Sequence, residues 1–178
     1  MKRIYCTKKL GEYIGVVDSN LPADNSELKP NDWNAHIFTL DRKKCLIFVH
    51  SLTHYTIFID QIKKSDLKVI NEIFREKLKS QMRNDNLTIN PKLSEKLCID
   101  KEIKFYKTNN NRRVLGRIND FVSNFKYHCK YKYSNLADMN VAYENGIINT
   151  TPIEMTIDNI KFWTTPINEM EKIIKASA

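Results

Sequence analysis

The segment from Cys45 to Val49 constrains the fold most, because every side chain in it is apolar. Successive side chains of a strand point to opposite faces of a sheet, so a strand here presents two apolar faces. Such a strand belongs inside a sheet that is covered on both sides. Residues 34–40 and 55–60 are also rich in strand-forming residues. Because the connections 41–44 and 51–54 are short enough for hairpins, we expect an antiparallel three-stranded meander.

Helical patterns flank this predicted sheet. The clearest covers residues 112–132, where apolar side chains recur at spacings of three and four. Other helices are predicted over residues 8–14, 65–82 with Ser65 as N-cap, 91–97, 138–148 with an interruption near Gly146, and from Pro166 onward. Further strands are predicted over residues 3–6, 103–107 and 157–163, and an exposed loop over residues 18–32. We therefore predict an α+β fold, in which a small antiparallel sheet (the meander plus one or two further strands) packs with about five helices.

The composition indicates one globular domain over residues 1–178. The chain is long enough for one substantial core, and its four glycines and five prolines argue against long flexible linkers. The four cysteines form no CxxC pair, so we expect buried thiols rather than disulfides or a zinc site. The sequence has no continuous apolar run typical of a signal peptide or a membrane span. We expect a cytoplasmic protein with no cofactor and no membrane partner.

Residues 104–133 hold almost all of the excess positive charge. This segment has eight basic residues and one acidic residue, Asp120, whereas the whole chain has a formal net charge of +8. Seven aromatic residues lie in the same segment. Cations interleaved with aromatic rings are typical of surfaces that bind nucleic acid or another polyanion. The predicted phosphate contacts are Arg112, Arg113, Arg117, Lys126 and Lys130.

Two other interpretations of the same helix stay open. The basic residues can be an ordinary solvated helix face, with their stems covering apolar surface. Alternatively, Asn119 and Asp120 lie beside the arginines and can form the centre of a small RNA- or nucleotide-processing enzyme. His128 is a third catalytic candidate, although its place beside the apolar stripe predicts partial burial. Because a nuclease needs several carboxylates around a metal ion and only Asp120 is evident, we expect a binding protein rather than an enzyme.

The other polar clusters favour structural roles. Cys45, His50 and His54 have the chemistry of zinc ligands. Regular alternation places Cys45 and His50 on opposite faces of a strand, so we expect no metal site and predict that both histidines are polar residues at the rim of the sheet. The charged segment 41–44 is typical of a solvent-exposed hairpin turn, although Asp41 can also be read as a general base.

Gly116 is unusual inside the predicted helix, because glycine costs about 1 kcal/mol there relative to alanine. This cost predicts a close approach to the backbone, either by another segment of the chain or by a ligand. We expect the contact to come from within the fold, so that replacement by alanine would destabilise the protein through overpacking.

The segment RRVLGRINDF at residues 112–121 resembles the VLGSMNDF-type motif of a small bacterial family of unknown function. In the same order, YCTKKL at 5–10, NDWNAHIFTLDRKKCLIF at 31–48, KTNNN at 107–111 and INTTP at 148–152 resemble further elements of that family. Arg117 stands where the family commonly has a serine and adds a cation. The resemblance implies a bacterial cytoplasmic protein of one domain, and it implies no activity.

These observations lead to one main expectation and two alternatives. We expect a non-enzymatic domain that binds nucleic acid or another polyanion through residues 112–132. The first alternative is the small enzyme centred on Asn119 and Asp120. The second is a protein-interaction module with a protein partner, as in a toxin–antitoxin or defence system, for which no sequence feature argues directly.

Overall fold

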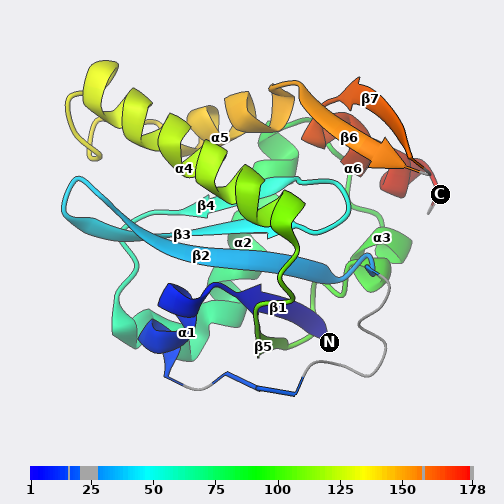
Figure 1. Cartoon of the computed structure of the whole chain (residues 1–178), viewed down its shortest axis with the longest axis horizontal. Coiled ribbons are helices and arrows are strands. Elements are labelled where there is room, and N and C mark those ends of the chain that lie inside the picture. The colour runs from blue at the N-terminus through cyan, green and yellow to red at the C-terminus, as the bar shows by residue number, and fades with distance from the viewer. Residues whose placement is uncertain (16, 21–27, 158, 177–178) are drawn as a thin grey trace.

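A mixed five-stranded sheet forms the centre of the computed structural model, which describes residues 1–15, 17–20, 28–157 and 159–176 (Figure 1). The strands lie in the order β4-β3-β2-β1-β5. They are β1 (Lys2–Cys6), β2 (Asp32–Leu40), β3 (Lys43–His50), β4 (Thr56–Ile59) and β5 (Ile103–Lys107). Strands β2, β3 and β4 form the predicted antiparallel meander, whereas β1 runs parallel to both β2 and β5.

The α+β class is therefore confirmed, but the prediction of a small antiparallel sheet was wrong. Parallel neighbours require long crossover connections, and such pairings leave no mark in the local residue pattern. The connection between β2 and β3 is the hairpin turn that the sequence predicts. Asp41 and Arg42 both adopt left-handed backbone conformations, with φ of 44° and 61°, as in tight two-residue hairpins.

The described residues form six α-helices, one 3-10 helix and a separate β-hairpin. The helices are α1 (Lys8–Ile14), α2 (Ile70–Asn84), α3 (Pro91–Lys96), α4 (Arg112–Tyr131), α5 (Val141–Thr150) and α6 (Pro166–Lys175), and the 3-10 helix is η1 (Lys64–Val69). The hairpin consists of β6 (Ile153–Ile157) and β7 (Ile160–Thr164). Asparagine caps explain several of the helix starts: the side chains of Asn90, Asn111 and Asn140 accept hydrogen bonds from the first turns of α3, α4 and α5.

Three predicted elements differ from those observed. Ser65 caps no helix, because η1 precedes α2 and the Ser65 hydroxyl donates to Asp66. The helix predicted over 138–148 begins only after its cap Asn140, and it continues through Gly146 without interruption. The strand predicted over 157–163 is instead the hairpin, whose turn includes Asn159 in a left-handed conformation (φ 64°).

In the predicted loop 18–32, residues 21–27 lie outside the described residues, and β2 begins at Asp32.

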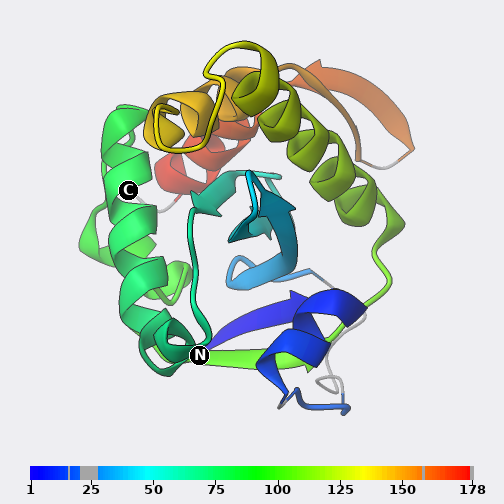
Figure 2. The same cartoon turned by 90° about the vertical axis from the view of Figure 1, so that its left-hand side faces the viewer.

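The sheet separates two hydrophobic cores, because β3 presents apolar side chains to both sides. Leu46 and Phe48 pack into the core covered by α2, whereas Cys45, Ile47 and Val49 pack into the core covered by α4. Figure 2 shows α2 and α4 on opposite sides of the central strands. This confirms the prediction that 45–49 is an interior strand covered on each face. No helix in the described part of the chain is long and apolar enough to cross a membrane.

Candidate functional site

Helix α4 packs one apolar stripe against the sheet and turns its polar side outward. The stripe agrees with the predicted pattern and consists of Val114, Ile118, Phe121, Val122, Phe125 and Cys129, all of them buried. Its centre is an aromatic contact, in which the rings of Phe58 on β4 and Phe125 stack with centroids 4.2 Å apart. The polar residues of α4 are therefore held rigidly relative to the sheet.

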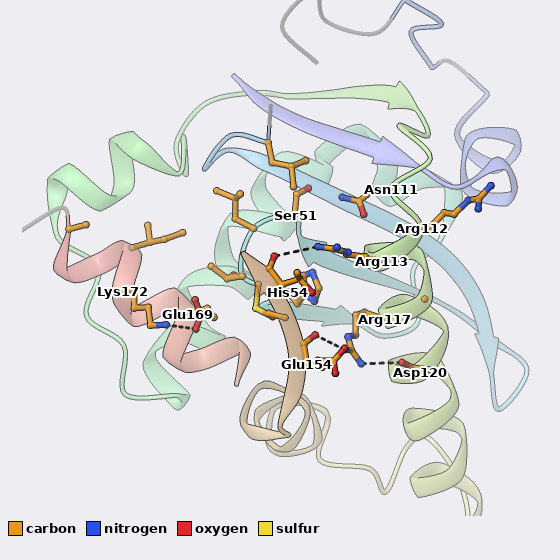
Figure 3. Close-up of a pocket in the computed structure, with 18 of the residues that line it drawn as sticks. Ser51, His54, Asn111, Arg112, Arg113, Arg117, Asp120, Glu154, Glu169 and Lys172 are labelled. Carbon is orange, nitrogen blue, oxygen red and sulfur yellow. Dashed lines mark hydrogen bonds and ion pairs between the residues drawn. The ribbon is translucent and has the colours of Figure 1, made fainter. Parts of the chain in front are cut away.

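The structure divides the five predicted phosphate contacts between two surfaces. Arg112, Arg113 and Arg117 lie in the first turns of α4, whereas Lys126 and Lys130 are exposed in its second half. Arg117 donates to the carbonyl oxygen of Glu154 on β6 over 2.9 Å, and Arg113 donates to that of Thr156 over 3.4 Å. Arg112 points away from these two side chains (Figure 3).

In the second half of α4, two tyrosines and two lysines form an exposed surface, which we call the tyrosine–lysine face: Lys126, Tyr127, Lys130 and Tyr131. Tyr127 and Tyr131 are 61% and 65% exposed, and their ring centroids are 4.9 Å apart. The ammonium group of Lys130 lies 4.9 Å from the centre of the Tyr131 ring. Residues 121–131 include no aspartate or glutamate, so this face is positive along its whole length.

Behind this face, a buried carboxylate joins α4 to α5. Glu144 is fully buried and accepts hydrogen bonds from His128, Lys132 and Tyr133, with 2.6 Å between its oxygen and Lys132 Nζ. Burial alone would raise the pKa of Glu144, but the three donors outweigh it and hold the pKa below its usual value. Lys132 also lies over the ring of Tyr143, which is 57% exposed and extends the aromatic surface.

The three catalytic candidates do not lie together. Asn119 and Asp120 are exposed, and Asp120 forms an ion pair with Arg117 over 3.5 Å. His128 lies eight residues further along α4, which is about 12 Å along the helix axis. It is half-buried, as predicted, and it binds Glu144 rather than a residue of the Asn119–Asp120 pair.

A cavity of about 890 Å³ opens beside the first half of α4 (Figure 3). Its walls come from six separate parts of the chain: Leu28, the 51–54 turn, Lys96 of α3, residues 111–120, residues 154–156 of β6, and residues 169–176 in and after α6. Cavities of this size are typical of small-molecule sites. Apart from the unusual Gly116, no local residue pattern indicates this cavity, because the segments that form it are far apart along the chain.

His54 lies in the wall of this cavity and is only 6% exposed. Its backbone is left-handed (φ 57°), a conformation that is unfavourable for residues other than glycine, and its side chain lies close to Arg113 and Arg117 of α4 (Figure 3). Its Nδ1 atom is buried without a hydrogen-bond partner among the described residues. Burial, together with the nearby charges of Arg117 and Arg113, lowers the pKa of His54 to about 4, so the ring is neutral at pH 7.

The expectation that Gly116 contacts another segment of this chain was wrong. A Cβ atom built on Gly116 meets no atom within 4 Å in the described structure. Gly116 instead lines the cavity between Arg113 and Arg117. The helix pattern placed it correctly on the polar side of α4, but the pattern could not show that the neighbouring space is empty.

Polar side chains of the two hairpin connections, which could have been metal ligands or a general base, form hydrogen bonds within the fold. His50 is completely buried, not at the rim, and its ring nitrogens lie 2.8 Å from Thr53 Oγ1 and 2.8 Å from the Pro30 carbonyl oxygen. Asp41 accepts a hydrogen bond from the backbone of Leu136 and so ties the β2–β3 turn to the segment after α4. Within the residues that the structure describes, no three His, Cys, Asp or Glu side chains are close enough to hold a metal ion.

A family model described as a domain of unknown function, DUF6933, matches residues 3–169. The chain therefore belongs to this family, which confirms the predicted membership in a family of unknown function. No curated protein and no solved structure matches the chain.

Proposed function

We propose that this member of the DUF6933 family binds single-stranded nucleic acid on the tyrosine–lysine face of α4. The observation that carries the proposal is the pair formed by Tyr127 and Tyr131, which lie one helical turn apart and are in contact with each other. Both rings are more than half exposed. Lys126 and Lys130 flank them on the same part of the helix.

Single strands fit this surface better than duplexes do. Unpaired bases stack on exposed aromatic rings, which contributes about 1–3 kcal/mol per base, and lysines neutralise the phosphates that follow the stacked bases. A duplex keeps its bases stacked on each other, so the tyrosines would gain little from it. The absence of acidic residues from 121–131 removes the repulsion that would otherwise oppose a polyanion.

The proposal predicts that reversing both lysines, Lys126→Glu and Lys130→Glu, weakens binding of a labelled single-stranded RNA or DNA by at least tenfold. Each lost phosphate contact also reduces the salt dependence, so the slope of log K against log salt concentration should fall by about 1.4 for two contacts. Fluorescence anisotropy at several salt concentrations measures both quantities.

The matched control is the double reversal Lys64→Glu and Lys68→Glu, which makes the same change in net charge at exposed positions of η1. This variant should bind within about threefold of the wild type, allowing for the general effect of net charge. Equal losses in the two double variants would show that only net charge matters and would contradict a site on α4.

A second pair of variants separates stacking from charge. Tyr127→Ala with Tyr131→Ala should weaken binding to the single strand, whereas Tyr127→Phe with Tyr131→Phe keeps both rings and should preserve it. Neither pair should change the weaker binding of a duplex of the same sequence. A wild-type protein that binds no oligonucleotide at low salt would overturn the proposed function.

A further inference from the structure

We propose that the cavity beside the first half of α4 binds a small phosphorylated ligand with an apolar body, of the size of a nucleoside monophosphate. The cavity lies apart from the tyrosine–lysine face, because Arg113 and Tyr127 are separated by about 21 Å along the helix axis. The inference therefore does not depend on nucleic-acid binding by that face. Four features of the cavity support it.

The first feature is the positive charge of Arg113. Its guanidinium contacts the carbonyl oxygen of Thr156, and it forms no ion pair with a carboxylate in the described parts of the chain. The three carboxylates of the cavity already have cationic partners: Asp120 pairs with Arg117, Glu154 with Lys161 and Glu169 with Lys172. Arg113 thus keeps donors and charge for an anion, and guanidinium groups bind phosphate through paired hydrogen bonds.

The second feature is the start of α4 itself. Asn111, the N-cap of this 20-residue helix, lies in the cavity wall together with Arg113. The amino end of a helix carries partial positive charge and favours a bound phosphate. Helix and arginine therefore attract an anion to the same place.

The third feature is His54, a buried imidazole in the cavity wall whose Nδ1 has no partner in the described structure. Buried polar atoms in folded proteins nearly always have a hydrogen-bond partner, so an orphaned one in a cavity wall points to a missing ligand. In Figure 3, His54 lies between Arg113 and Arg117, so a ligand held by the arginines would be next to it. The neutral ring offers both a donor and an acceptor to the hydroxyl or phosphate oxygens of such a ligand.

The fourth feature is the shape and polarity of the remaining wall. Leu52, Met155 and Ile173 give the cavity an apolar part that suits a ring system rather than a second charge. The empty space at Gly116 leaves the backbone of α4 accessible to the ligand between the two arginines. An anionic group joined to an apolar body matches both parts of the cavity.

Titration calorimetry with AMP, inorganic phosphate and adenosine tests the proposal. AMP should bind, and phosphate and adenosine should each bind at least tenfold more weakly, because each has only one of the two groups. Arg113→Met should weaken AMP binding at least tenfold. Arg83→Met, which removes the same charge from an exposed position of α2 outside the cavity wall, should stay within threefold of the wild type.

Two further variants test whether His54 and Gly116 in the cavity wall contact the ligand. His54→Asn, whose side chain tolerates the left-handed backbone, should weaken AMP binding without unfolding the protein. Gly116→Ala should weaken AMP binding while leaving the melting temperature equal or higher, a combination that a structural role does not produce. Lys126→Glu with Lys130→Glu should leave AMP binding unchanged, which separates this inference from the proposed nucleic-acid site.

The phosphate can come from a free nucleotide or from the end of a strand, and 5′-phosphorylated and 5′-hydroxyl oligonucleotides distinguish these sources. A strand end is indicated if the 5′-phosphate increases affinity at least tenfold and Arg113→Met removes that increase. A free nucleotide is indicated if AMP binds more tightly than the phosphorylated strand. The inference is overturned if neither AMP nor the phosphorylated strand binds at millimolar concentration, or if Arg83→Met and Arg113→Met cause equal losses.

Discussion

At the scale of single residues, Glu144 shows how a buried charge is tolerated in this protein. Its carboxylate is fully buried, and three side chains from α4 and the segment after it donate hydrogen bonds to it. Replacing one of its two oxygens by an amide NH2 group removes an acceptor and the negative charge, and a buried donor left without a partner typically costs about 1–3 kcal/mol. The cluster holds His128 and Tyr133 close to α5 and positions the surface that contains Tyr143.

We predict that Glu144→Gln lowers the free energy of unfolding by about 1–3 kcal/mol at pH 7, measured by urea denaturation. Because the folded-state pKa of Glu144 lies below its unfolded value, its contribution is present above that unfolded value and is lost as the pH falls through the folded pKa. The difference between wild type and variant should therefore shrink below about pH 4.5. A difference that stays constant down to pH 3 would contradict this role.

At the scale of elements, α4 combines a rigid apolar stripe with a glycine that no neighbour requires. We predict that Gly116→Ala raises the free energy of unfolding by about 1 kcal/mol in the absence of ligand, since alanine is the better helix former and its methyl group meets open space. For a chain of this length the melting temperature should rise by about 2–4 °C. Thermal melts followed by circular dichroism measure this change.

Gly146 in α5 provides the matched control. A Cβ atom there would lie 3.1 Å from the Asp85 carboxylate, which Tyr55 and Gln81 hold in place. Gly146→Ala should therefore stabilise the protein less than Gly116→Ala, or destabilise it. If Gly116→Ala is instead the more destabilising of the two, its surroundings are more crowded than the structure shows.

At the scale of the whole molecule, helix α5 closes the β4 edge of the sheet. The Asn149 amide accepts from the backbone N–H of Thr56 over 2.8 Å and donates to its carbonyl oxygen over 3.2 Å, much as a neighbouring strand would. Asn145 donates to the same carbonyl over 2.9 Å. Asn149 also donates to Asp85, so one side chain connects the sheet edge to the end of α2.

We predict that Asn149→Ala lowers the free energy of unfolding by about 1–3 kcal/mol, because it leaves the buried backbone N–H of Thr56 without its partner. Asn124→Ala, on the exposed side of α4, should change stability by less than about 0.5 kcal/mol. Urea denaturation of both variants measures the difference. Similar values for the two would show that Asn149 does not seal the sheet edge.

Local patterns in the sequence predicted the individual elements well. The apolar stripe of α4, the interior strand β3, the hairpin turn at Asp41 and the helix that begins at Pro166 all follow from residue spacing and turn chemistry. Each depends on interactions between residues close along the chain. At Ser65 and at residues 157–163 the local prediction was wrong, because a 3-10 helix precedes α2 and a turn that includes Asn159 divides the predicted strand between the two arms of a hairpin.

The sequence by itself determined that this chain has an α+β fold, an interior strand with two apolar faces and one strongly basic helix. The tertiary structure alone decided that β1 runs parallel to β2 and β5, that the cations of α4 belong to two surfaces, and that His54, Arg113 and Gly116 share a cavity. The physical reason is the separation along the chain of the residues that make each kind of contact. Residue spacing records contacts within a helix or a hairpin, whereas a cavity depends on which distant segments pack together and how much space they leave.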